Sequence, residues 1–236
     1  TQVTTPISTG MQRGDGGGTR NWDGIPCGTL VAWTDGLMCP RKLCETERRS
    51  ILGLPQGPDD SPNRADVEYL LVVPWNATYL IPELAAERPR TSRQLAMALY
   101  TSTKVGVIGF DTVPLTSSET TGDGMPGEFA GYLAAAQHYD RIGTISEAAA
   151  VEYRGWRTML AGVGMSGPEI QSITLAAEVS EPLASDMAVA RSRLVIGDLP
   201  MVLCVGTHEP RKNHLSVLHA AELLWREGHK FGLTFI

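Results

Sequence analysis

The sequence predicts an α/β protein built on an open, mostly parallel β-sheet of the Rossmann type, with helices on both faces. Short and almost entirely apolar runs alternate along the chain with longer segments of helical spacing. Apolar runs of this kind are typical of parallel strands that are buried on both faces of a sheet. Ligands of such sheets bind at the carboxyl ends of the strands, so functional residues are expected there.

The size and charge of the chain limit what it can do. It has 236 residues, 42% of them hydrophobic, and a net charge of −6. A substantial core is therefore possible, in one large domain or one and a half. An acidic chain does not attract nucleic acid, so an anionic ligand needs a local site. The apolar runs are too short to span a bilayer and the polar start does not resemble a signal peptide, which predicts a cytoplasmic location.

The first predicted strand and helix lie in the middle of the chain. The apolar run EYLLVVPW, residues 68–75, predicts a buried strand. The segment TSRQLAMALYTS, residues 91–102, has helical spacing, and Thr91 or Ser92 would cap its amino end. The earlier GDGGG segment has no strand before it and no helix after it, so it is interpreted as a loop.

Three more strands and two helices complete this half of the chain. KVGVIGF predicts a buried strand that places Asp111 at its carboxyl end. RIGTIS predicts the next strand, after which Ser146 would cap a helix that begins at Glu147. EIQSITLA predicts a short last strand. The helix predicted between the first two of these strands, GEFAGYLAAAQHY, carries an apolar face made of Phe129, Leu133 and Ala136.

The chain is expected to change domain after residue 176. Residues 177–200 show neither the strand nor the helix period and are interpreted as a linker. Residues 201–236 predict a strand at 201–206, a helix at about 214–227 and a strand at FGLTFI. A β-α-β unit of this size cannot form its own core. We therefore expect a first α/β domain at 1–176 and the truncated start of a second Rossmann-like domain.

Arg211 and Lys212 lie in the loop between the strand and the helix of this second unit. Asn213 would cap the helix and Gly228 would end it. Cations just before the amino end of a helix are unfavourably placed unless an anion lies between them and the unpaired N–H groups. Pro210 would stiffen the turn. The residues alone leave two alternatives open, an anion site or solvated loop charges.

Three segments resemble retaining GT-B glycosyltransferases of the group 1 family. VLCVGTHEPRKNHLSVLHAAELLWREG resembles the start of the second domain of these enzymes, and its PRKN block is the most specific part. IGFDTVPLTSSET and YDRIGTISEAAAVEY resemble two segments of the first domain. The resemblance covers roughly residues 100–236, and it implies a GT-B-like fold of two Rossmann-type domains.

The resemblance also implies a donor site and an activity. Arg211 and Lys212 would be catalytic residues, which bind the diphosphate of a nucleotide-sugar and stabilise it as the leaving group. Gly206 and Thr207 would complete the diphosphate site. The implied reaction moves a hexose to a glycan or glycolipid acceptor in surface polysaccharide synthesis, with peripheral association at the inner face of the membrane. The donor, often GDP-mannose in this family, is a substrate, and no metal or other cofactor is implied.

Acceptor contacts are expected at the carboxyl edge of the first sheet. The candidates are Asp111, Ser146 and Glu147. The alternatives are a capping or turn role for Asp111 and helix capping for Ser146. Further candidates flank the cationic loop of the second unit, namely His208, Glu209 and His214.

The sequence departs from the family pattern in ways that keep rival interpretations open. Phe110 stands where many members have a histidine, and the acidic Glu-x7-Glu motif would lie beyond Ile236. The family's glycine-rich first-domain loop has no clear counterpart, which together with the missing motif predicts truncation at both ends. The rivals are a non-catalytic scaffold of the same fold and a sugar-nucleotide epimerase-like α/β enzyme.

Overall fold

The computed structural model describes residues 31–33, 39–43, 47, 49, 71–174 and 182–236. The backbone divides into two compact units. They are Thr1–Ser118 with Asp123–Glu178, and Glu119–Gly122 with Val179–Ile236. The domain and linker limits expected from the sequence stay predictions, because a compact backbone does not by itself make an independent domain.

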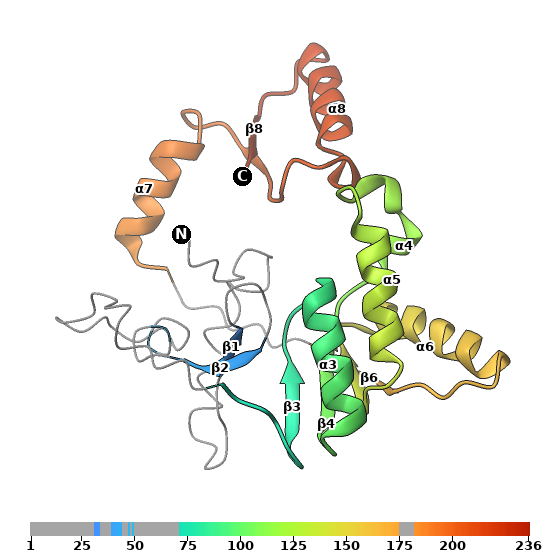
Figure 1. The fold of residues 1–236 in the computed structure, drawn as a ribbon. Coiled ribbons are helices and arrows are strands. Elements are labelled where there is room, and N and C mark those ends of the chain that lie inside the picture. Colours follow the sequence, from blue (N-terminus) through green and yellow to red (C-terminus); the bar gives the residue numbers. More distant parts are fainter. Residues whose placement is uncertain (1–30, 34–38, 44–46, 48, 50–70, 175–181) are drawn as a thin grey trace. The chain divides into compact units, whose positions relative to one another are not determined.

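A four-stranded parallel sheet forms the centre of the first unit (Figure 1). Its strands follow one another in space as they do in the chain. They are β3 (Thr78–Ile81), β4 (Lys104–Gly109), β5 (Arg141–Thr144) and β6 (Glu169–Ser172). This sheet confirms the predicted α/β class.

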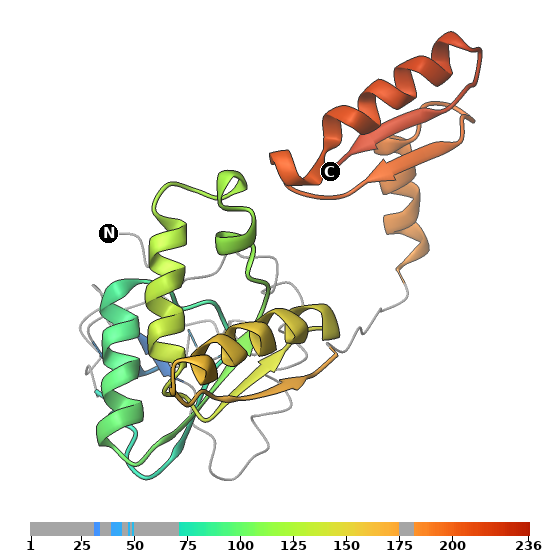
Figure 2. The ribbon, with the colours of Figure 1, turned by 90° about the vertical axis from the view of Figure 1, so that its right-hand side faces the viewer.

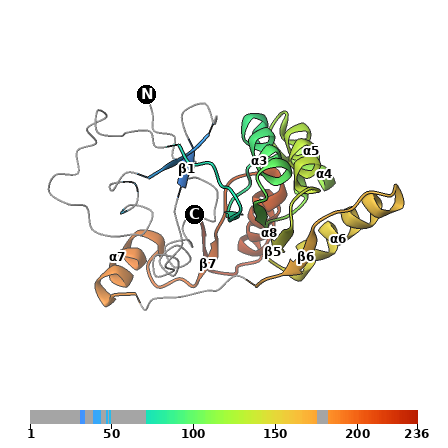
Figure 3. The ribbon, with the colours of Figure 1, turned by 60° about the horizontal axis from the view of Figure 1, so that its bottom comes forward.

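Helices α3 (Arg88–Tyr100), α5 (Met125–Ala136) and α6 (Glu147–Gly162) connect these strands. Each connection advances to the next strand in the same direction, so right-handed crossovers place all three helices on one face. Helices α3 and α5 lie side by side (Figures 1 and 3). The described connecting helices thus lie on one face of the sheet, and helices on the other face stay a prediction. The core lies between them and the sheet, and includes Val105, Val107, Phe129, Tyr132, Ile142 and Tyr153.

Short elements lie beside this framework. Helix α4 (Val113–Thr116) and the 3₁₀ turn η2 (Ser118–Thr120) follow β4. Strands β1 (Val31–Trp33) and β2 (Pro40–Lys42) pair with each other in antiparallel fashion. The guanidinium of Arg90 on α3 lies 5.4 Å from the centre of the Trp33 ring, so it links β1 to the helix layer.

The first predicted strand is wrong. Of the run at 68–75, residues 71–75 form no strand of the parallel sheet, and Leu71, Val73 and Trp75 are exposed. The remaining residues, 68–70, lie outside the described part. The first parallel strand is instead β3, a few residues later. Its side chains alternate in burial, so one face of this strand is more buried than the other.

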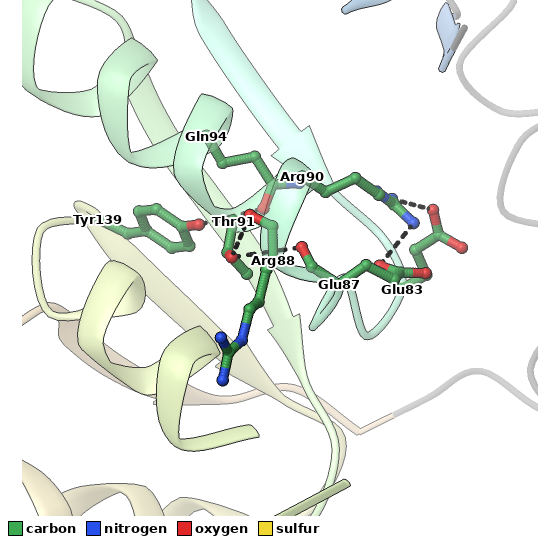
Figure 4. A network of polar contacts seen from close by, with 7 residues as sticks. All are labelled: Glu83, Glu87, Arg88, Arg90, Thr91, Gln94 and Tyr139. Atoms are coloured by element: carbon green, nitrogen blue, oxygen red, sulfur yellow. Dashed lines mark hydrogen bonds and ion pairs between the residues drawn. The ribbon is translucent and has the colours of Figure 1, made fainter. Parts of the chain in front are cut away.

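The predicted amino end of the next helix is also wrong. Helix α3 begins at Arg88, with Glu87 in the capping position and proline in its first turn. Thr91 is therefore a helical residue, and its hydroxyl donates to the backbone carbonyls of Glu87 at 3.3 Å and Arg88 at 3.1 Å (Figure 4). Pro89 is the second residue of the helix, and its fixed φ suits the first helical turn, so the helix begins before Thr91.

The helices after β4 and β5 confirm their predictions. Phe129, Leu133 and Ala136 are buried on α5. Ser146 caps α6, since its hydroxyl oxygen accepts a hydrogen bond from the backbone N–H of Ala149 at 3.2 Å.

The second unit contains the predicted β-α-β arrangement (Figure 2). Strands β7 (Met201–Cys204) and β8 (Gly232–Phe235) pair in parallel and are joined through helix α8 (His214–Arg226). Gly228 follows the helix with a φ of 94°, which a glycine adopts without strain. The unit also contains a helix that the sequence did not predict, α7 (Ala184–Leu194), within the expected linker. Good helix formers are frequent there, but no apolar period marks them.

Candidate functional site

The loop between β7 and α8 brings the predicted donor residues together. Gly206 follows the end of β7, and its N–H donates to the carbonyl of Ile236 at 2.8 Å, which ties the loop to the end of β8. A Cβ atom at Gly206 would lie 3.8 Å from Cδ of Lys212. The stem of Lys212 therefore folds back towards the start of the loop. The 3₁₀ turn η3 (Pro210–Lys212) carries both cations, and all three of its residues are exposed.

Arg211 makes an ion pair within the loop. Its Nη2 lies 2.9 Å from Oε1 of Glu209, and 40% of the Arg211 side chain is exposed against 28% of Glu209. Partly exposed pairs of this kind are weak and readily exchange partners. An incoming anion would compete with the Glu209 carboxylate for the Arg211 guanidinium.

Asn213 joins the turn to the helix in a way that the sequence did not predict. It occupies the capping position of α8, but its side chain makes no capping hydrogen bond, which corrects the expected role. Its φ of 53° lies in the left-handed region, which asparagine tolerates better than most residues. The bend at Asn213 places η3 directly before the first turn of α8. The amino end of the helix, where N–H groups lack helical partners, therefore follows the two cations.

The arrangement of this loop suits an anionic ligand. Gly206, Thr207, Arg211 and Lys212 all belong to the segment that follows the carboxyl end of β7. Two cations, a nearby helix amino end and glycine backbone are the features that bind phosphate groups in proteins. A diphosphate is the expected ligand class, and its assignment to these residues stays a prediction.

Two histidines and a phenylalanine lie beside the cations. The ring centre of His214, the first residue of α8, is 4.8 Å from that of His208 and 5.2 Å from that of Phe235. Phe235 ends β8, so the three rings gather where both strands end. Within the described ranges, no group of three His, Cys, Asp or Glu side chains could hold a metal ion.

The acceptor-side candidates lie in the first unit, at the carboxyl ends of β4 and β5. Asp111 is exposed, and its Oδ1 accepts from the Val113 N–H at 3.2 Å. Glu147 pairs with Arg154, and both side chains are exposed. Asp111 makes the contact of a turn residue before α4, whose capping position is Thr112, and Ser146 makes the contact of a helix cap. These are the alternatives left open above. The contact of these candidates with an acceptor stays a prediction.

Sequence reasoning missed the residue that holds Thr112, which is next to Asp111. The Glu152 carboxylate on α6 accepts hydrogen bonds from the backbone N–H and the hydroxyl of Thr112. Tyr153, the next residue of α6, is buried, and its burial raises its pKa to about 12. Its hydrogen bond with Tyr132 lowers this pKa, and the negative charges of Asp111 and Glu152 raise it. No local pattern could indicate these partners, because they come from different elements.

In the part of the chain that the structure describes, no helix combines the length and the apolar character needed to cross a bilayer. No protein-family model and no solved structure matches the chain.

Three curated proteins, each described as the serotype-specific mannosyltransferase WbdA of Escherichia coli, do match it. Two are 25% identical over 183 residues and the third is 24% identical, and each match covers 75% of this chain. The match takes in only 21–22% of the relatives, so the chain spans about a fifth of their length. The chain is thus a distant relative of these mannosyltransferases.

Proposed function

We propose that the chain is part of a retaining hexosyltransferase of GT-B architecture. It would transfer a hexose, with mannose as the first candidate, from a nucleotide-diphosphate sugar to a glycan or glycolipid acceptor. The observation that carries the proposal is the loop between β7 and α8, which places Arg211 and Lys212 directly before the amino end of a helix. The distant relatives are named as mannosyltransferases, which supports a role in polysaccharide synthesis. We propose the inner face of the membrane as the place of this role.

The proposed chemistry depends on charge. When the bond between sugar and phosphate breaks, negative charge grows on the departing nucleoside diphosphate. Arg211 and Lys212 are adjacent cations on one short turn, so they stabilise this charge more strongly in the transition state than in the bound donor. Both residues therefore act on the rate as well as on donor binding. The proposed reaction requires the donor and the acceptor and no metal ion or other cofactor.

One observation favours a second candidate, a non-catalytic scaffold of the same fold. Phe110, at the carboxyl end of β4, carries no group that can transfer a proton or donate a hydrogen bond from its side chain. A scaffold would retain the loop and bind anions without turning over a donor.

The test is sugar transfer by the longest native polypeptide that contains this chain, with Arg211→Ala and Lys212→Ala variants. We expect kcat/KM to fall in each variant by a factor that corresponds to about 2–4 kcal/mol of lost transition-state stabilisation, the effect of losing one contact to a developing anion. Arg226→Ala is the matched control, since Arg226 is an exposed cation at the far end of the same helix. Unchanged transfer in both loop variants would refute the proposal, and donor binding without any transfer would favour the scaffold.

A further inference from the structure

His214 occupies a fixed position at the end of the cationic loop. Its ring lies edge-on to those of His208 and Phe235, with interplanar angles of 79° and 67°. His208 belongs to the loop after β7, and Phe235 is the last residue of β8. The imidazole is therefore held where the carboxyl ends of both strands meet the amino end of α8.

Both ring nitrogens of His214 are buried, and neither has a hydrogen-bond partner in the described part of the chain. A neutral imidazole has one N–H donor and one acceptor. An unpaired buried polar group costs on the order of 1–3 kcal/mol, so such groups are rare in native proteins. Arg90 and Gln94 each have an unpaired buried nitrogen too, but their other polar atoms have partners (Figure 4). In His214 the whole polar function of the ring is unpaired.

We propose that His214 is a donor-binding residue, whose ring N–H donates a hydrogen bond to a phosphate oxygen of the nucleoside diphosphate. The inference rests on the proposed function, because it adds a contact to the same anion. Arg211 and Lys212 precede the ring, and the amino end of α8 begins at it, so the two cations and the helix end favour a negative ligand, while the Glu209 carboxylate competes with that ligand for Arg211. An imidazole offers an N–H donor in both its neutral and its protonated form.

Access to the ring requires the η3 turn to move, because the ring nitrogens are shielded from solvent. All residues of the turn are exposed, so a shift disrupts little packing. Gly206, in the loop before the turn, and Asn213, directly after it, have positive φ values of 154° and 53°. Glycine adopts such backbone conformations freely and asparagine more readily than most residues, so these two positions are the candidates for the hinges of the shift.

The test measures the binding of inorganic pyrophosphate to this chain by calorimetry, together with thermal melting. His214→Phe keeps an aromatic ring between His208 and Phe235 but removes both nitrogens. We expect the Kd for pyrophosphate to rise about tenfold, from the loss of one hydrogen bond to a charged group. The melting temperature should stay or rise, because an apolar ring replaces an unpaired polar one. His219→Phe, an exposed site on the same helix, should leave binding unchanged.

The variants separate the inference from the proposed function. If Lys212→Ala weakens pyrophosphate binding and His214→Phe does not, the inference is wrong and the anion site remains. If the unaltered chain does not bind pyrophosphate, both are wrong. If His214→Phe lowers both binding and melting temperature, His214→Gln decides, because it restores an N–H donor. Recovery of binding in His214→Gln supports the inference, and no recovery overturns it.

Discussion

The Glu152 carboxylate accepts two hydrogen bonds from Thr112, one from the backbone N–H at 3.0 Å and one from the hydroxyl at 2.8 Å. Glu152 lies on α6 and Thr112 follows Asp111 after β4, so one side chain joins two elements at the carboxyl edge of the sheet. Thr112 is buried, and its N–H therefore depends on this partner.

Glu152→Ala should destabilise the first unit. Hydrogen bonds to a charged group contribute about 1.5–3 kcal/mol, and the variant also leaves the buried Thr112 donors unpaired. The free energy of unfolding, measured with urea, should fall by about that amount. Glu169→Ala is the control, because the Glu169–Arg141 ion pair is exposed and should contribute under about 1 kcal/mol. Equal losses in the two variants would contradict a special role of Glu152.

Alkaline pH should destabilise the fold through the buried Tyr132–Tyr153 pair. Burial raises the pKa of Tyr153 to about 12 and that of Tyr132 well above its usual value. The unfolded chain loses these protons near its ordinary tyrosine pKa, of about 10, before the folded chain does. The stability that these two tyrosines contribute is therefore complete below the tyrosine pKa of the unfolded chain, and it is lost as the pH rises from there through their pKa in the folded chain. In urea unfolding, the free energy of unfolding of Tyr153→Phe should fall less steeply with pH, above a pH of about 10, than that of the unaltered chain. An equally steep fall in both proteins would contradict the contribution of Tyr153.

Ser146→Ala should reveal the capping role of a residue that is also an acceptor-side candidate. The hydroxyl oxygen accepts from the Ala149 N–H, and loss of such a cap costs about 1 kcal/mol. Ser146→Asp should keep most of the stability, because aspartate also caps helices and its charge suits the amino end. The readout is the free energy of unfolding. Equal stability of all three proteins would show that the cap contributes nothing.

Gly109 is expected to tolerate no side chain. A Cβ atom there would lie 2.6 Å from Cγ2 of Ile142 and 3.1 Å from Cε2 of Tyr153. Gly109→Ala should therefore destabilise the first unit by about 1–3 kcal/mol through overpacking. Gly131→Ala, within α5, meets no atom within 4 Å and should stabilise the fold by about 0.5–1 kcal/mol. Thermal melting of the two variants should give shifts of opposite sign.

The elements that could be predicted are marked by local chemistry. Ser146 bonds to a residue of the same first helical turn, and Gly228 adopts a backbone conformation suited to its own residue type. Both signals depend on near neighbours in the chain. Helix α8 was therefore placed to within a residue at both ends, and helix α6 was placed correctly at its amino end.

The elements that could not be predicted depend on tertiary packing or lack a period. Leu71, Val73 and Trp75 belong to the apolar run that predicted a strand, yet they are exposed. The edge strand of the described parallel sheet is β3 instead. Helix α7 is exposed along almost its whole length. Residues 177–200 show no sustained apolar period, which is the signal that would have predicted a helix there.

The candidate site divides in the same way. Arg211 and Lys212 are adjacent in the sequence, so their clustering before a helix was evident. The contact of His214 with Phe235 joins the first residue of α8 to the last residue of β8, and the Glu152–Thr112 bonds join α6 to the loop after β4. Such contacts follow from strand pairing and helix packing, which no single segment specifies.

The last prediction concerns the Arg211–Glu209 ion pair, in which Nη2 and Oε1 lie 2.9 Å apart. If an anion competes with Glu209 for Arg211, Glu209→Gln should tighten pyrophosphate binding by about threefold to tenfold, because a nearby negative charge is removed. Arg211→Ala should weaken binding. In that variant Glu209→Gln should increase the affinity for pyrophosphate by less than it does in the unaltered chain, because the cation that pairs with Glu209 is gone. Glu222→Gln breaks the exposed Arg226–Glu222 pair on α8 and should change nothing. Weaker binding in Glu209→Gln would mean that this carboxylate holds Arg211 in place for the ligand.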